Sequence, residues 1–217
     1  MSSHAHGSDR VAPAPAATDM LGRMTSEPPF GPPGDPERHV ALAELERRFE
    51  RLAPGPCDTG RVRFVVKRAP DKTRNLLDRI ELRPGTGIPG DAWGRHPAPD
   101  PIGELTVMEL AVAELIANGQ PVTVFGDNLF MDLDLSCQNL PTGSRLRVGE
   151  ALLEVTPKPH NGCRKFAARF GNDALRFVSK QELRHRNLRG IYMRVLEGGR
   201  VEPGASVEVL SRAPVDV

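Results

Sequence analysis

Residues 145–166, RLRVGEALLEVTPKPHNGCRKF, join a strand pattern to a helix pattern around one cysteine. In residues 145–156, apolar and polar side chains alternate on both sides of a Gly-Glu turn, which is typical of a half-buried β-hairpin. Two prolines follow and should end the strand pairing, because proline has no backbone N–H to donate. Phe166 and Phe170 are four residues apart, which predicts a helix. The pattern therefore places Cys163 at or near a helix N-terminus.

This position has chemical consequences for Cys163. Unpaired N–H groups and the helix dipole stabilise an anion at a helix start, and Arg164 and Lys165 add positive charge beside it. The thiolate is the nucleophilic and metal-binding form of cysteine, so the pattern favours a reactive or ligating side chain. A buried, inert cysteine is the competing interpretation, because free cysteines are among the residues most often found in protein cores.

The chain divides into three segments by composition. Residues 1–36 are rich in Ala, Pro, Gly and Ser and cannot bury enough apolar surface to offset their ordering entropy, which predicts an irregular or disordered tail. Residues 37–58 hold apolar side chains at helical spacing and then a Pro-Gly-Pro linker signal. We expect residues 59–212 to form the main domain.

Short strands and glycine turns dominate this main domain. The largest helical pattern covers residues 105–118, where apolar side chains recur at helical spacing before an Asn-Gly stop. Many strands and few helices predict a mostly β barrel or sandwich. Besides the hairpin, the expected strands are residues 62–66, 79–83, 122–125, 188–196 and 206–210.

Composition excludes several classes of protein. The 217 residues carry 29 Lys and Arg against 28 Asp and Glu, a net charge of +1, so no global field attracts nucleic acid or an anionic membrane. No apolar run approaches the roughly 18 residues that span a bilayer, and no secretory signal core is present, which predicts a cytoplasmic protein. Three cysteines at long spacing argue against a disulfide framework and a four-cysteine zinc site.

A series of short motifs resembles one known family in its order and spacing. The motifs are GIPGD at 87–91, GDNL at 126–129, LPTGSRLRVG at 140–149, HNGCRKF at 160–166, RGIYMRV at 189–195 and GG at 198–199. Together they look like a MOSC domain over about residues 60–210. This domain is named for the C-terminal part of molybdenum cofactor sulfurases, and it is also present in amidoxime-reducing molybdoenzymes and in stand-alone bacterial proteins.

The resemblance implies a MOSC-type β-barrel with a few peripheral helices and one essential cysteine. By position this is Cys163, which would carry sulfur as a persulfide or bind molybdenum, with His160 as its neighbour at the catalytic site. The implied cofactor is molybdenum cofactor (molybdopterin). Asp127 and Asn128 could orient a bound ligand, but an Asp-Asn pair in a turn is equally often a local backbone cap, so their ligand role stays open. The candidate cofactor-binding residues are Arg164, Lys165, Asp127, Asn128, Asp91 and Arg189, with Arg194 as a further basic side chain.

The sequence departs from the family pattern at two positions. Where the family often has Gly-Asp-x-His, Asp91 is followed by Ala92 and Trp93, and the nearest histidine is His96. The usual Glu-Asn-Leu is Asp-Asn-Leu at residues 127–129, which keeps the acidic character. Trp93 therefore stands where the family motif often has its histidine.

Two partner proteins follow from what the domain lacks. The 60 residues before the barrel cannot build a pyridoxal phosphate domain, so sulfur would come from another protein such as a cysteine desulfurase. No ferredoxin-type cysteine cluster is present, so a redox reaction would need an external electron donor.

Three functions remain open from the sequence. The first is an enzyme that catalyses a molybdenum-dependent reduction or a sulfur transfer, and the sequence leans toward it. The second is a non-catalytic module that stores or delivers cofactor or sulfur. In the third, His160 and Cys163 form half of a zinc site, although structural zinc usually takes four ligands.

Overall fold

The computed structural model describes residues 31–213 of the chain. Most of the predicted tail, residues 1–30, and residues 214–217 therefore lie outside the described part. The helical elements are η1 Pro36–Arg38, α1 Leu42–Glu50, α2 Leu110–Ala117, η2 Val122–Val124, α3 Arg164–Phe170, α4 Asn172–Val178 and η3 Gln181–Arg186. The strands are β1 Thr59–Arg68, β2 Arg74–Leu76, β3 Ile80–Leu82, β4 Leu105–Glu109, β5 Leu129–Met131, β6 Arg145–Val148, β7 Ala151–Val155, β8 Ile191–Glu197, β9 Gly199–Val201 and β10 Ser206–Ser211.

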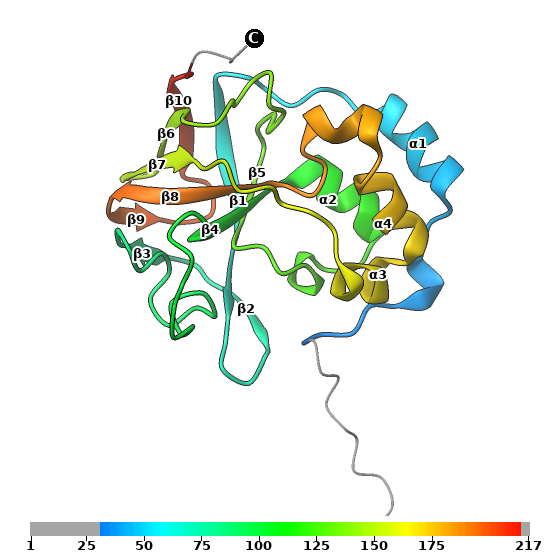
Figure 1. The fold of residues 1–217 in the computed structure, drawn as a ribbon, viewed down its shortest axis with the longest axis horizontal. Helices are drawn as coiled ribbons and strands as arrows, with labels where there is room; N and C mark the ends of the chain where they lie inside the picture. Colours follow the sequence, from blue (N-terminus) through cyan, green and yellow to red (C-terminus); the bar gives the residue numbers. More distant parts are fainter. Residues whose placement is uncertain (1–30, 214–217) are drawn as a thin grey trace, which may run out of the picture.

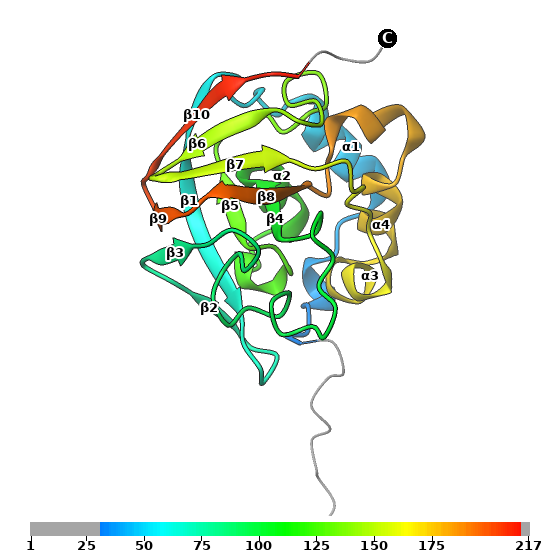
Figure 2. The same cartoon turned by 60° about the vertical axis from the view of Figure 1, so that its left-hand side comes forward.

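Seven strands close into a barrel in the order β10, β6, β7, β8, β4, β5 and β1, and β1 pairs back onto β10. Only the β4–β5 pair among them is parallel. Strand β2 extends the sheet beyond β1, and β3 with β9 forms a separate two-stranded ribbon. Figure 2 shows β10, β6, β7 and β8 side by side on the barrel wall. The mostly β barrel with a few helices that we predicted is confirmed.

Two hydrophobic cores hold the molecule together. One fills the barrel with side chains such as Val107, Leu153 and Met193. The other lies between the barrel and the helices and is rich in aromatic rings, among them Phe130 from β5 and Phe170 from α3. The helices gather on one side of the barrel, as Figure 1 shows. The helices therefore cover the outer face of the barrel on this side. A binding site can form at the boundary between the helices and the barrel.

Two sequence-based assignments are wrong. The predicted helix over residues 105–118 begins as strand β4, and only Leu110–Ala117 is helical. All five residues of β4 are buried, so the strand shows no polar alternation that would separate it from the apolar helix behind it. The predicted strand at residues 122–125 is the 3₁₀ helix η2, whose run of β-branched side chains misled the prediction.

The segment before the barrel packs against it. Asp35 caps η1 by accepting a hydrogen bond from the Glu37 backbone N–H at 3.0 Å. Gly34 lies so close to the backbone of Arg169 that a Cβ there would be 1.9 Å from the Arg169 carbonyl oxygen. Nε2 of His39 lies 3.2 Å from the same carbonyl oxygen. Residues 34–39 thus brace the end of α3. No described helix is long and apolar enough to cross a bilayer.

Glu109 is a buried carboxyl group at the end of β4, with 6% of its surface exposed. Burial and the nearby carboxylate of Asp134 raise its pKa from 4.5 to about 7, although Arg186 acts in the opposite direction. Between these two pH values the folded protein holds a proton at Glu109 that the unfolded chain has lost. The free energy of unfolding should therefore fall as pH rises through this window, by about 2–3 kcal/mol for this group.

Urea unfolding at pH 5 and pH 8 measures this effect. In Glu109→Gln the difference in the free energy of unfolding between pH 5 and pH 8 should shrink, because the amide does not titrate. Some dependence should remain, since burial also raises the pKa of Glu104. A Glu109→Gln variant with the full pH dependence of the parent protein would contradict the assignment.

Candidate functional site

The loop after β7 brings Cys163 to the start of α3. Thr156 fastens the beginning of this loop, since its hydroxyl donates to the Ile102 carbonyl at 2.7 Å. Cys163 is the N-cap of α3, and its carbonyl oxygen accepts hydrogen bonds from the backbone N–H groups of Phe166 and Ala167. The Phe166 side chain is buried and anchors the first turn. The predicted helix start is confirmed, and Cys163 is exposed rather than packed in the core.

Cys163 lines a cleft of about 510 Å³ at the edge between the barrel and the helices. None of the described residues that line this cleft is Asp or Glu. Although the whole chain carries a net charge of only +1, seven of its 29 Lys and Arg residues line this cleft. Such a lining attracts and holds anions. The seven basic residues of this cationic cleft are Arg68, Lys72, Arg74, Arg95, Lys165, Arg169 and Arg189.

Arg74 is a half-buried arginine in this lining. Burial, followed by repulsion from Arg169 and Arg68, lowers its pKa to about 10. Its Nε is buried without a hydrogen-bond partner, and no salt bridge to it occurs among residues 31–213. A Cβ on Gly126 would lie 3.8 Å from Nη2 of Arg74 and 3.9 Å from Nη1 of Arg169, so both guanidinium groups reach the same point of the loop. Two like charges held this close favour an anion between or beside them.

A buried carboxylate supports the part of the cleft wall that Arg189 and His160 form. Asp127 is fully buried, and its Oδ2 accepts a hydrogen bond from Nη1 of Arg189 at 2.7 Å. Its Oδ1 lies 3.7 Å from Nδ1 of His160, and neither atom has a hydrogen-bond partner. Burial, then repulsion from Arg189, lowers the pKa of His160 to about 3. The imidazole is therefore neutral at physiological pH, and it packs on the Tyr192 ring at 4.6 Å between centroids.

The backbone around Arg189 depends on glycine. Gly190 has a φ of +96° and lies at the point where the chain enters β8. A Cβ there would be 2.2 Å from the Val107 carbonyl oxygen, so no larger residue fits. This close approach of two strands fixes where Arg189 leaves the barrel wall.

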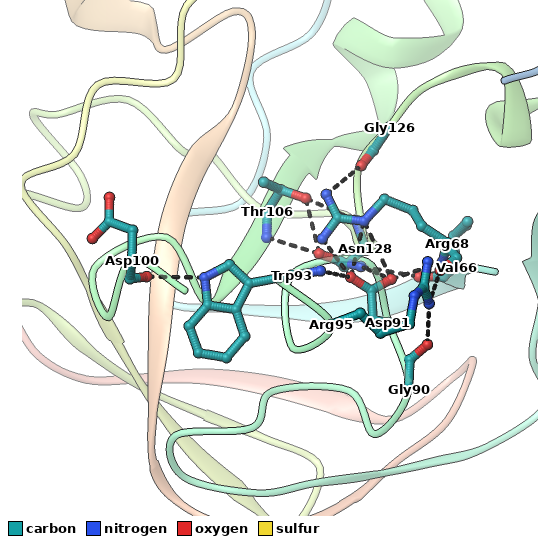
Figure 3. A network of polar contacts seen from close by, with 10 residues as sticks. All are labelled: Val66, Arg68, Gly90, Asp91, Trp93, Arg95, Asp100, Thr106, Gly126 and Asn128. Atoms are coloured by element: carbon teal, nitrogen blue, oxygen red, sulfur yellow. Dashed lines mark hydrogen bonds and ion pairs between the residues drawn. The ribbon is translucent and has the colours of Figure 1, made fainter. Parts of the chain in front are cut away.

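Asp91 and Asn128 form a polar network beneath the cleft, which Figure 3 shows. The Asp91 carboxylate accepts hydrogen bonds from the Arg68 guanidinium, at 2.5 Å from Nη2, and from the Asn128 amide at 3.2 Å. The Asn128 Oδ1 accepts from the hydroxyl of Thr106 at 3.0 Å. Burial alone would raise the pKa of Asp91, but the hydrogen bonds and charge of Arg68 hold it below its usual range. The network orients Arg68 on the cleft wall.

The structure divides the predicted site residues into three groups. Cys163, His160, Lys165 and Arg189 line the cationic cleft. Asp127, Asn128 and Asp91 are buried under it and hold its side chains in place. Arg164 and Arg194 do not line it, and Arg194 pairs with Glu154 at 2.6 Å. His96, the nearest histidine to the departing motif, binds the Ala98 backbone away from the cleft.

Sequence reasoning missed five of the basic lining residues. Lys165 and Arg169 are four residues apart on α3, so helical spacing could have identified Arg169 as a neighbour on the same face. The sequence contains no comparable signal for the other four residues. They reach the cleft only because the β1–β2 hairpin and the loop after β3 fold toward it. These residues are Arg68, Lys72, Arg74 and Arg95.

Comparison with known proteins agrees with this architecture. The family model described as MOSC domain matches residues 108–208. The chain contains a MOSC domain. In the structure the MOSC barrel extends beyond the matched residues, because β1 pairs with both β5 and β10. The MOSC family is associated with molybdenum cofactor binding.

Individual relatives are similar over part of the chain. This chain is 39% identical to the uncharacterized protein YflK of Bacillus subtilis over 88 residues. The match covers 41% of this chain and 37% of YflK. The chain thus spans little more than a third of the length of YflK. The YUAD protein from Bacillus subtilis has a TM-score of 0.51 at 16% identity, over 70% of this chain and 95% of that one. A structure described as a hypothetical protein has a TM-score of 0.53 at 25% identity, over 80% of this chain and 72% of that one. These structures share the fold.

Proposed function

We propose that this MOSC protein binds molybdenum cofactor in the cationic cleft and uses Cys163 as its sulfur ligand or as a sulfur carrier. The observation that carries the proposal is the joint placement of an exposed thiol and seven basic side chains in one cleft without a carboxylate among the described lining residues. The phosphate of the pterin is an anion that such a lining suits. The sulfur of Cys163 is a soft ligand of the kind that molybdenum accepts.

The residues present fit a phosphate-bearing group. Arginine presents several N–H donors in a planar fork that matches phosphate oxygens. Arg74 has a buried Nε without a partner, and Arg74 and Arg169 converge at Gly126. Arg68, oriented by Asp91, adds a third guanidinium, and its Nη1 lies 3.4 Å from the Gly126 carbonyl oxygen. We assign the phosphate to these three side chains.

The chain's other residues have separate tasks in this proposal. When bound, the cofactor supplies a metal centre that exchanges electrons or sulfur. Asp127 holds Arg189, and the neutral ring of His160 forms part of the wall without adding charge. Among the described residues, no three His, Cys, Asp or Glu side chains converge as metal ligands, so a metal at Cys163 would draw most of its ligands from a cofactor.

Reaction of Cys163 needs a protein partner. In sulfur transfer, the Cys163 thiolate would attack the sulfane sulfur of a donor persulfide, as on a cysteine desulfurase, and release the donor thiolate. In reduction, an external electron-donor protein would supply the electrons. The molybdenum, zinc and sulfane sulfur content of protein from a molybdenum-replete host tests the proposal. Zinc alone, or none of the three, would overturn it.

Alkylation rates give a readout that does not depend on loaded cofactor. The Cys163 thiolate forms an S–C bond with iodoacetate or iodoacetamide and displaces iodide into solution, but only iodoacetate is an anion that the cationic cleft attracts. The ratio of the two rates at Cys163 should be higher than at Cys57 and Cys137, which are exposed but do not line the cleft. Arg74→Gln should lower the ratio at Cys163 by about 2- to 5-fold at low salt.

Arg176→Gln is the matched control for this prediction. Arg176 lies on α4, and 69% of its side chain is exposed away from the cleft lining. The ratio at Cys163 should be unchanged in this variant. Equal ratios at the three cysteines in the parent protein would show that the cleft does not concentrate anions near the thiol.

A further inference from the structure

A second cleft of about 460 Å³ lies where the 159–161 loop meets the end of α4 and the residues after η3. Its lining is polar and includes Asn161, Ser179 and Asn187. It also contains the basic residues Lys180 and Arg184, and no described lining residue is acidic. The second cleft therefore offers hydrogen-bond donors and positive charge together.

Two side chains connect the second cleft to the cationic cleft. His160 and Arg189 line both. Their side chains are 7% and 11% exposed, and each carries a buried nitrogen without a partner, Nδ1 of His160 and Nε of Arg189. The two clefts thus share one wall, made by this pair of side chains. The buried carboxylate of Asp127 lies next to both side chains, 3.7 Å from Nδ1 of His160 and 2.7 Å from Nη1 of Arg189.

The charge of the second cleft comes mainly from Arg184. Lys180 pairs with Glu46 at 2.5 Å and with Glu182 at 2.9 Å, which neutralises most of its effect. Arg184 is exposed, and no salt bridge in the described part of the chain involves it. Arg189 shares its charge with Asp127. An uncompensated guanidinium beside amide and hydroxyl groups is the recognition chemistry of oxyanions.

We propose that the second cleft is a binding site for a small molecule that carries an oxyanion, such as a carboxylate or phosphate group. The second cleft has its own lining residues, apart from His160 and Arg189, which it shares with the cleft that we assign to the cofactor. If the cationic cleft holds the cofactor, as proposed above, the ligand of the second cleft shares these two residues with it. The binding itself does not depend on that function.

The test is a titration of the full chain with inorganic phosphate at pH 7, followed through ¹⁵N-labelled backbone amides. Signals of Asn161, Ser179 and Asn187 report on the second cleft, while those of Gly126 and Ala92 report on the cationic cleft. We expect saturable shifts in both sets. Arg184→Gln should weaken the apparent phosphate affinity of the second set by about 5- to 10-fold, the loss of one charge-assisted hydrogen bond.

Two further variants separate the clefts. Arg74→Gln should weaken binding only at Gly126 and Ala92, and Arg176→Gln should change neither set. The proposal is overturned if Asn161, Ser179 and Asn187 do not shift saturably, or if Arg184→Gln acts no differently from Arg176→Gln. Loss of the Gly126 and Ala92 shifts alone would count against the cofactor site and leave the second cleft intact.

Discussion

Cys163→Ser should reduce bound molybdenum or sulfane sulfur to background while the protein stays folded. The substitution removes the soft sulfur that binds a metal or carries a persulfide and replaces it with a hard, poorly nucleophilic hydroxyl. The fold should survive because Cys163 is exposed and is the N-cap of α3, where serine is among the preferred residues. The measurement is elemental analysis and sulfane sulfur assay on protein from a molybdenum-replete host, with thermal unfolding alongside.

The other two cysteines provide the controls. Cys57→Ser and Cys137→Ser should retain molybdenum and sulfane sulfur, because neither cysteine lines the cationic cleft. A Cys163→Ser protein that keeps both would show that the thiol is not the ligand or the carrier. The loop before α3 would then be a structural connection and not the functional centre.

Asp127→Ala should destabilise the protein by about 3–5 kcal/mol, the range for removing one partner of a buried ion pair. Asp127 is fully buried, and the Arg189 side chain with which it pairs is 11% exposed. The variant therefore leaves an uncompensated guanidinium inside the protein. For a chain of this size, the melting temperature should fall by about 10 °C. Urea unfolding, monitored by circular dichroism, measures the change in free energy.

Asp132→Ala is the matched control for this loss. Asp132 also pairs with an arginine, Arg63, at 3.0 Å, but both side chains are more than a third exposed. Solvent screens such a pair, so its removal should cost about 0–1 kcal/mol. Equal losses in the two variants would mean that the pair beneath the cleft contributes no more than a surface salt bridge.

Sequence periodicity predicted the elements that have one solvent-facing side. The β6–β7 hairpin alternates because one face lies in the barrel core and the other meets water, and α3 was found from the spacing of two buried phenylalanines. Strand β4 is buried on both faces, so nothing in its sequence separated it from α2. Period alone cannot distinguish a short buried strand from a helix.

The place of Cys163 in the fold was more predictable than the arrangement of the arginines around it. The helix start at Cys163 was predicted because its sequence signals all lie in one segment, from the end of β7 to the first turn of α3. Arg74 and Arg68 were missed because they reach the cleft only after β1 and β2 pair and fold toward Gly126. Their proximity is a product of tertiary structure, which one sequence does not encode as a local pattern.

The pairing of β1 with β10 sets a condition on how the chain folds. Thr59 aligns with Glu208, so the two strands that close the barrel are nearly as far apart in sequence as the domain allows. Contacts of high sequence separation slow folding, because the intervening chain must be ordered before they form. During synthesis β1 leaves the ribosome long before β10 exists, and until then β1 and β6 each have an open edge that can pair with another chain. Closure should therefore be late and slow, and aggregation should compete with it at high expression rates.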